Sequence, residues 1–225
     1  MADVWEAVVK AIELIMTGDQ NVYQTTLLSL FISGTATLLA ALWGTPIAMI
    51  LGLKNFRGKS LVKSFFNALI GMPTVALGLI LYFIFSSKGG PLGFLRLLYT
   101  PTAVIIGEAV LITPIIVTLA TTAIEAIDPE IANLAKTLGA NDAQVSVAVL
   151  KEASNGIFSA ILTSFNRAIA ELGVALMVGG NIVLTTQIAS QINYDLTISV
   201  ALTIILLLVV FLTNTLVYLI RRKKK

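Results

Sequence analysis

Residues 128–152 read DPEIANLAKTLGANDAQVSVAVLKE and form the longest polar interruption in a chain that is otherwise mostly apolar. The apolar runs before and after it are long enough to cross a bilayer. The polar stretch itself predicts two short helices joined at residues 138–141. We therefore expect an aqueous loop held between membrane helices, and a loop of this length needs a function of its own.

The composition indicates an integral membrane protein with one domain. Of the 225 residues, 57% are hydrophobic and only 12% are charged, whereas a soluble domain averages about 25% charged residues. The absence of cysteine and histidine removes disulfides, thiol nucleophiles, Ser-His-Asp triads and the commonest metal ligands, which argues against an intramembrane enzyme. The net charge is +3, and the positive charges are confined to a few loops. This distribution indicates membrane topology and not nucleic-acid binding.

Five apolar runs predict an all-α fold with five transmembrane helices. They cover about residues 26–53, 65–85, 103–127, 157–178 and 196–220, within a domain at residues 22–220. Pro73 and Pro114 lie inside the second and third runs. Each predicts a helix kink, because proline removes a backbone donor that lipid cannot replace. A kink in a transport pathway and a kink made for packing both fit Pro73.

Residues 1–20 predict an amphipathic helix ahead of the first span. Trp5, Val8, Ile12, Ile15 and Met16 recur at helical spacing, with charged side chains on another face. Such a helix lies either on the membrane surface or against the outer face of its own domain.

The basic residues predict which side of the membrane each loop faces. With the C-terminus in the cytoplasm, eleven Lys and Arg residues face inward and three face outward, which is a strong positive-inside signal. The inward set is Lys54, Arg57, Lys59, Lys63, Lys136, Lys151 and residues 221–225. The N-terminus is then outside, the 128–152 loop is cytoplasmic, and the basic tail at 221–225 is a topology anchor.

The turn after the first span contains a sequence that looks like a phosphate-binding loop. Gly58-Lys59-Ser60 matches the end of that motif, which also needs a glycine five residues before Gly58. Leu53 stands there instead, and the segment follows a membrane helix and not a strand. We interpret it as a basic cytoplasmic turn without an ATP site.

The first half of the 128–152 loop predicts a helix with one apolar stripe. Ile131, Leu134, Ala135 and Leu138 fall at i, i+3, i+4 and i+7, and Gly139 supplies the backbone freedom to end the helix. Such a helix lies in the membrane interface or docks into a groove on a soluble partner.

This loop resembles the signature cytoplasmic loop of ABC importer permeases. The family pattern is Glu-Ala-Ala, three residues, Gly, nine residues, Ile, one residue, Leu-Pro. With Gly139 at the glycine, residues 134–135 fall at the two alanines and Val149 at the Ile, whereas Asn133 replaces the Glu and residues 151–152 replace Leu-Pro. The resemblance implies a type I importer permease with a coupling helix that sits in a cleft of the ATPase subunit. The implied coupling residues are Asn133, Leu134, Ala135, Lys136, Thr137, Leu138, Gly139, Ala140 and Asn141.

A second resemblance lies in the fourth span. Residues 167–182 read RAIAELGVALMVGGNI and are similar to the segment Arg-Ala-Leu-Gly-Glu-Phe-Gly-Ala-Thr-(Leu/Ile)-Met, ending Gly-Asn-Ile, of molybdate and sulfate permeases. Ala170 and Leu172 stand at the usual Gly and Phe, and Thr186-Gln187 continue the match. The divergent coupling loop and the retained Asn-Ile and Thr-Gln pairs look most similar to the tungstate permeases of this group.

Three charged residues fall inside predicted spans. Arg167 and Glu171 are four residues apart, which predicts one helix face, and Glu108 lies in the third span. Charges at this depth need a partner or water, so they should face the interior of the bundle. Arg167 and Glu171 are either a structural ion pair or part of an anion pathway. Glu108 is either a partner of Arg167 or a pathway residue.

The leading hypothesis is the membrane subunit of an ATP-driven importer for a tetrahedral oxyanion, tungstate or molybdate. The chain carries no ATP site, so the resemblance implies separate ATPase subunits that hold ATP and Mg²⁺, an extracellular or periplasmic oxyanion-binding protein, and a location in the prokaryotic plasma membrane. One five-span subunit cannot readily enclose a pathway, so we expect a homodimer working by alternating access. A permease for sulfate, phosphate or another solute and a non-transporting membrane scaffold are the alternatives.

Overall fold

The computed structural model of the chain describes residues 4–222. Within that range every regular element is a helix, as the sequence predicts. The helices are α1 (Val4–Thr17), α2 (Gln20–Leu53), α3 (Lys59–Ile70), α4 (Thr74–Phe85), the 3₁₀ turn η1 (Gly93–Leu95), α5 (Pro101–Glu125), α6 (Pro129–Thr137), α7 (Asp142–Ile169), α8 (Gly173–Gly179), α9 (Leu184–Gln191) and α10 (Leu196–Arg222).

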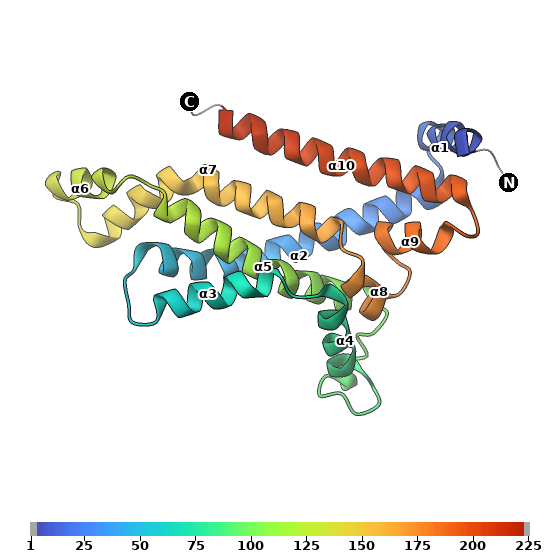
Figure 1. Cartoon of the computed structure of the whole chain (residues 1–225), viewed down its shortest axis with the longest axis horizontal. Coiled ribbons are helices and arrows are strands. Elements are labelled where there is room, and N and C mark those ends of the chain that lie inside the picture. The colour runs from blue at the N-terminus through green and yellow to red at the C-terminus, as the bar shows by residue number, and fades with distance from the viewer. Residues whose placement is uncertain (1–3, 223–225) are drawn as a thin grey trace.

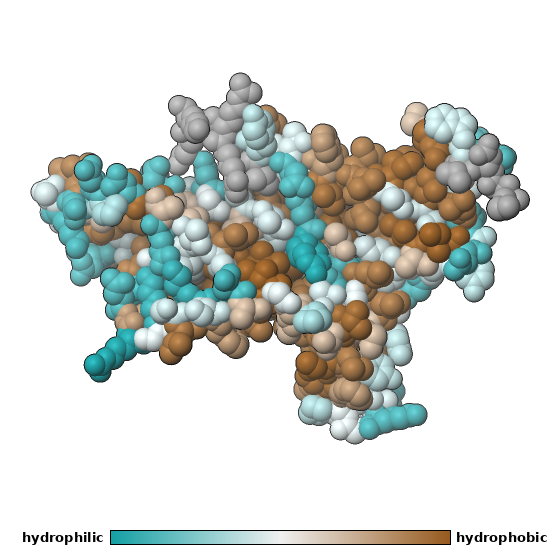
Figure 2. Space-filling model, viewed as in Figure 1, coloured by the Kyte–Doolittle hydropathy of each residue, from teal (hydrophilic) through white to brown (hydrophobic). Residues whose placement is uncertain are grey.

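Four of these helices are long enough and apolar enough to cross a membrane. They are α2, α5, α7 and α10, and two bent pairs could each add a span, α3–α4 at 97° and α8–α9 at 86°. Figure 1 shows the four long helices running along the long axis of the molecule, with α6 at one end and α1 and α9 at the other. Hydrophilic residues gather at the α6 end, and hydrophobic residues cover α4 and much of α10 (Figure 2).

The central helix is α5. In its most apolar window 67% of the residues are buried, against 33% in α2 and 17% in α10. It packs against α2, α3, α7 and α8. Small buried residues such as Ala103, Ala109 and Ala120 let these neighbours approach closely.

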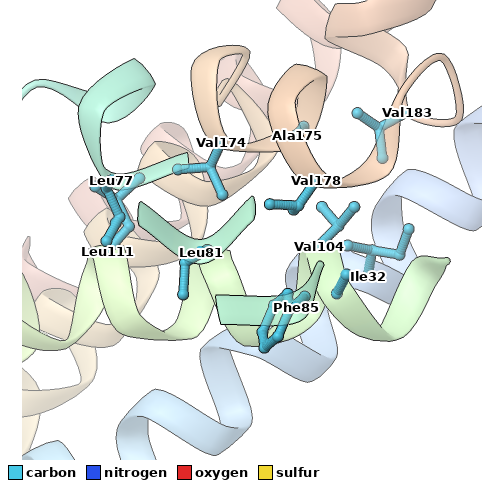
Figure 3. Packing of buried hydrophobic residues seen from close by; sticks show 11 residues of the cluster. Ile32, Leu77, Leu81, Phe85, Val104, Leu111, Val174, Ala175, Val178 and Val183 are labelled. Atoms are coloured by element: carbon cyan, nitrogen blue, oxygen red, sulfur yellow. The ribbon is translucent and has the colours of Figure 1, made fainter. Parts of the chain in front are cut away.

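The largest apolar cluster joins α2, α4, α5 and α8. Ile32, Val104 and Val178 lie side by side, and Leu81 of α4 belongs to the same cluster (Figure 3). Two short helices, α4 and α8, therefore cover the first half of α5 and belong to the core.

The N-terminal helix packs against its own domain, which is one of the two arrangements that its sequence allows. Ala7 and Ala11 are buried, and α1 packs against α10. A second apolar stripe with Trp5, Val9 and Met16 stays exposed, and Met16 is 82% exposed. One face of α1 is thus fixed to its own domain, and contact of the other face with lipid stays a prediction.

The second apolar run does not form one continuous helix. Residues 65–85 belong to α3 and α4, which meet at 97° across Gly71-Met72-Pro73. The predicted position of the distortion is right, but its size exceeds a kink. By contrast, α5 runs unbroken through Pro114, and a kink at that proline stays a prediction.

The loop and the fourth span also differ from expectation. The second loop helix is not separate, because α7 begins at Asp142 and continues to Ile169. The run 157–178 is interrupted after Ile169, and α8 begins only at Gly173. Arg167 therefore lies in α7, whereas Glu171 lies in the break between the two helices.

Candidate functional site

The helix α6 is fixed at its start by its own sequence. The Asp128 side chain accepts a hydrogen bond from the Glu130 N–H at 2.9 Å, and Pro129 occupies the first helical position. Both features favour a helix start, because proline needs no partner there and the carboxylate satisfies a free donor. The loop thus contains a preformed helix of nine residues.

The end of α6 turns the chain directly into α7. Gly139 has φ of +84°, a conformation that glycine adopts without strain, and the Ala140 N–H donates to the Ala135 carbonyl at 3.0 Å. The Asn141 side chain accepts from the Gln144 N–H at 3.0 Å, and the Gln144 side chain accepts from the Asn141 N–H at 2.9 Å. This capping box starts α7. The connection is therefore short, and each backbone N–H group of residues 138–141 donates a hydrogen bond.

The outer surface of α6 carries exposed apolar side chains. Leu134 is 63% exposed and Leu138 is 80% exposed, and the polar residues Asn133, Lys136 and Thr137 are exposed as well. The other two members of the predicted stripe, Ile131 and Ala135, are only partly exposed. The face available to a partner is therefore narrower than the stripe and is centred on Leu134 and Leu138.

The second group of predicted residues lies where α7 ends. Arg167 Nη1 donates to Glu171 Oε2 at 2.5 Å. The Glu171 side chain is 2% exposed and the Arg167 side chain is 39% exposed. The other Glu171 oxygen accepts from the Val174 N–H at 3.1 Å, and the Thr185 hydroxyl donates to the Glu171 carbonyl at 2.5 Å. Glu171 therefore connects α7, α8 and α9 at one point.

Glu108 of α5 lies close to this point. It is 1% exposed, and Ser33 of α2 hydrogen-bonds its carboxyl group. Its Oε2 atom has no hydrogen-bond partner in the part of the chain that the structure describes. Arg167 is paired with Glu171, and no salt bridge between Glu108 and Arg167 occurs among residues 4–222. Three charged residues thus meet near the α7–α8 break, one of them with an unfilled acceptor.

The two helix breaks lie against each other. A Cβ atom on Gly173, the first residue of α8, would lie 2.4 Å from the Thr74 hydroxyl oxygen and 2.9 Å from the Val75 nitrogen. Thr74 is the first residue of α4. Only glycine permits this approach, so the starts of α4 and α8 are in direct contact.

The loop between α8 and α9 has hydrogen bonds that the sequence does not predict. Gln187 Nε2 donates to the Asn181 carbonyl at 2.9 Å, and the Ser190 hydroxyl donates to Asn181 Oδ1 at 3.0 Å. The Leu184 N–H donates to the buried Ser29 hydroxyl of α2 at 2.8 Å. The pairs Asn181-Ile182 and Thr186-Gln187 were the sequence features that could have indicated these contacts. A hydrogen bond joins the two pairs.

Comparison with known proteins places this architecture in a family. Residues 44–225 match the model of the family described as "Binding-protein-dependent transport system inner membrane component". The chain is 39% identical to the tungstate uptake system permease protein TupB of Peptoclostridium acidaminophilum, over 92% of this chain and 93% of that protein. It is 34% identical to a protein of Haloferax volcanii described as "Probable anion ABC transporter permease protein", over 83% of this chain and 80% of the other.

A solved structure has the same fold. The MetNI methionine ABC transporter in inward facing conformations superposes with a TM-score of 0.72 at 18% identity, covering 89% of this chain and 95% of the other. The chain therefore belongs to the binding-protein-dependent inner membrane components, the multi-pass permeases of ABC importers.

Proposed function

We propose that the chain is the membrane subunit of an importer for tungstate or for another tetrahedral oxyanion such as molybdate. The observation that carries this proposal is the 39% identity, over nearly the whole of both chains, to a protein named as a tungstate uptake permease. A relative named only as an anion permease, 34% identical, supports the broader class of cargo.

The working assembly is a homodimer with two ATPase subunits and an oxyanion-binding protein. ATP and Mg²⁺ belong to the ATPase subunits, and the pathway lies at the two-fold axis between the permeases. The eleven-to-three distribution of basic residues supports a cytoplasmic α6 and an N-terminus outside. Residues 223–225 of the basic tail lie outside the described residues.

In this mechanism α6 is the coupling helix. Its exposed residues Leu134 and Leu138 enter a groove on the ATPase, and closure of the ATPases moves the two copies of α6 together. The hydrogen-bonded turn at residues 138–141 passes this movement to α7. Because α7 has 28 residues without interruption, it reaches about 42 Å, from the coupling loop to the Glu171 joint.

The Glu171 joint is the element that the movement of α7 rearranges. Arg167 has part of its guanidinium free of Glu171 and is 39% exposed, so it is the residue suited to attract an oxyanion. Glu108 and Glu171 are buried carboxyl groups and would repel a dianion, so they hold the joint and do not contact the cargo. Switching of access then accompanies movement of α8 and α4, which pack together.

The test is ATP-dependent uptake into vesicles that contain the permease, the ATPase and the binding protein. We expect saturable tungstate uptake that molybdate competes with. Titration of the partner binding protein with tungstate, molybdate and sulfate by calorimetry identifies the preferred anion. Sulfate uptake that tungstate does not inhibit would contradict the proposed cargo and leave the importer class intact.

The coupling assignment has its own test. Gly139→Pro abolishes the φ of +84° that ends α6, so we expect loss of ATPase binding and of uptake. Gly139→Asn is the matched control, because asparagine tolerates this conformation. Intact uptake and ATPase binding in Gly139→Pro would show that α6 is not the coupling element.

A further inference from the structure

A cavity of about 670 Å³ lies between the end of α2, α3 and the second half of α5. Ser60, Ser64 and Asn67 line it from one face of α3, at spacings of i, i+4 and i+7. Thr118 and Thr121 line it from α5. None of the outward residues of α6 and none of the three charged residues near the α7–α8 break borders this space. Two polar helix faces thus border a cavity that the transport mechanism above does not use.

The cavity lies between α3 and α5, which contact each other beside it. No residue of α3 is buried. The first turns of α3 are held by two ion pairs to the last residue of α5, Lys59 Nζ to Glu125 Oε1 at 3.0 Å and Lys63 Nζ to Glu125 Oε2 at 2.6 Å. These side chains are 20–40% exposed, so the pairs are weak and open to exchange with another anion.

The ion pairs leave the cavity with an excess of positive charge. Lys59 and Lys63 both line it, and they share a single carboxylate. Two ammonium groups and one carboxylate carry one uncompensated positive charge. An anion entering the cavity therefore meets a net attraction and does not have to displace a complete pair.

Two buried hydroxyl groups in the cavity wall lack hydrogen bonds. Thr121 is 2% exposed, and neither its hydroxyl nor that of Thr118 has a partner in the range that the structure describes. Their neighbours Thr122 and Thr113 donate to carbonyls of their own helix, at 2.9 and 2.6 Å. Buried polar groups are rarely left without a partner. The two free hydroxyls indicate a ligand with hydrogen-bond acceptors.

The start of α3 adds backbone donors to the same cavity. Gly58 precedes the helix with φ of +89°, and no side chain caps the first turn. Gly58, Lys59 and Ser60 all border the cavity. The first N–H groups of a helix attract anions, and Gly-Lys-Ser at such a position is also found in phosphate-binding loops. A complete nucleotide-binding loop has a glycine at the position that Leu53 occupies here. Because that glycine is missing, we limit the ligand to a single oxyanion group.

We infer that this cavity binds one tetrahedral oxyanion group between α3 and α5, at the α6 end of the bundle. The group is the phosphate of an anionic phospholipid or a free inorganic phosphate, since both offer the same acceptors to lysine, hydroxyl and backbone donors. Bound there, it shares Lys59 and Lys63 with Glu125 and accepts from the Thr121 hydroxyl. The site ties α3 to α5.

The experiment uses the full chain, purified in detergent and depleted of lipid. It is titrated in separate arms with sodium phosphate and with short-chain phosphatidylglycerol, each against sodium chloride of equal ionic strength, by calorimetry and by thermal unfolding. We expect saturable binding and a rise in melting temperature in at least one arm. Thr121→Val and Lys59→Gln should each weaken binding about tenfold, the loss of one hydrogen bond to a charged group. Lys151→Gln, an exposed lysine of α7 away from the cavity, should bind as the unchanged protein does.

The Thr121→Val variant separates loss of binding from loss of folding. Thr121→Val preserves the shape of the side chain and removes a hydroxyl without a partner, so without ligand it should melt at the same temperature or higher. Saturation by phosphate identifies a free oxyanion, and saturation by the lipid alone identifies a head group. Absence of saturable binding in both arms, or equal binding by Thr121→Val and the unchanged protein, would overturn the inference.

Discussion

The break between α3 and α4 and the break between α7 and α8 lie against each other but have different chemistry. At the first, the Gly71 and Met72 N–H groups donate to carbonyls of the preceding turn, both at 3.2 Å, and Pro73 has no N–H to satisfy. At the second, the Val174 N–H depends on the Glu171 carboxylate, which Arg167 neutralises. The N–H groups that follow α3 are satisfied by their own backbone, whereas the Val174 N–H at the second break depends on one buried side chain.

This difference matters for a protein in a membrane. Backbone groups at that depth have no water to bond, so a broken helix needs another source of partners. A break closed by its own backbone tolerates changes in the surroundings. A break closed by an ion pair responds to anything that changes the pair, which suits the end of α7 as a point of conformational control. We expect substitutions at the second break to have the larger effects.

The largest effect is expected for Glu171→Ala. The substitution leaves Arg167 and the Val174 N–H without their partner, and Glu171 is 2% exposed. Loss of an acceptor that serves one buried N–H and one charged donor costs about 3 kcal/mol. Thermal unfolding in detergent measures the loss, together with uptake in vesicles.

Glu171→Gln provides the control for this first prediction. Glutamine keeps an acceptor for the Val174 N–H and loses only the charge, so we expect a smaller loss of stability. If Glu171→Ala melts at the temperature of the unchanged protein, the ion pair does not hold the break.

The second effect is expected at the contact between the two breaks. Gly173→Ala places a Cβ atom 2.9 Å from the Val75 nitrogen, a backbone atom that cannot rotate away. Overpacking of this kind costs roughly 2 kcal/mol. Thermal unfolding is again the measurement, and Gly34→Ala is the matched control, because a Cβ atom there meets nothing within 4 Å.

A double variant locates the clash. Thr74→Ala removes the hydroxyl that would lie 2.4 Å from the added Cβ atom but leaves the Val75 nitrogen in place. The pair Gly173→Ala and Thr74→Ala should therefore recover only part of the lost stability. Complete recovery would mean that the backbones of α4 and α8 are not in contact.

The sequence predicts a distortion between α3 and α4 but not the break between α7 and α8, and the reason is physical. Pro73 removes a donor and can be read directly from its position in an apolar run. Residues 172–178 continue the apolar character of the run after Glu171, so composition predicts one uninterrupted span. The chain leaves the helix there because Glu171 accepts from Val174 and Thr185 bonds the Glu171 carbonyl. These contacts depend on tertiary structure, which hydropathy does not report.

The candidate coupling loop was better determined by its sequence. Asp128, Pro129 and Gly139 are local signals, and the structure uses each of them to begin or end α6. The partial burial of Ile131 and Ala135 could not be predicted, because it depends on the contact of α6 with α7. The cavity beside α3 could not be predicted from the sequence either, because it depends on how loosely α3 packs. No residue of α3 is buried.

The third prediction compares two prolines. Pro73→Ala adds an N–H and relaxes the bend between α3 and α4, whereas Pro114 lies inside the unbroken helix α5. We expect each substitution to change stability by about 1 kcal/mol or less. Only Pro73→Ala should broaden the distance distribution between spin labels on α3 and α4.

The labels for this measurement can be placed without background. The chain contains no cysteine, and Leu61 and Phe83 are 77% and 62% exposed, so Leu61→Cys and Phe83→Cys give one label on each helix. Pro114→Ala in the same labelled protein is the control. Equal distance distributions in both proline variants would show that Pro73 does not set the bend.

The last prediction concerns Thr185→Val and tests whether Thr185 and Glu171 stabilise the second break independently. The Thr185 hydroxyl donates to the backbone carbonyl of Glu171, and its loss should cost about 1 kcal/mol. Thr203→Val is the control, since the Thr203 hydroxyl bonds the Ser199 carbonyl of its own helix. Because the carbonyl at 171 survives Glu171→Ala, a double-mutant cycle separates two cases. Independent contacts would add, whereas a break that Glu171 positions for Thr185 should show a coupling of at least about 0.5 kcal/mol. A coupling of zero would show that the Thr185 hydrogen bond and the Glu171 side chain stabilise the break independently.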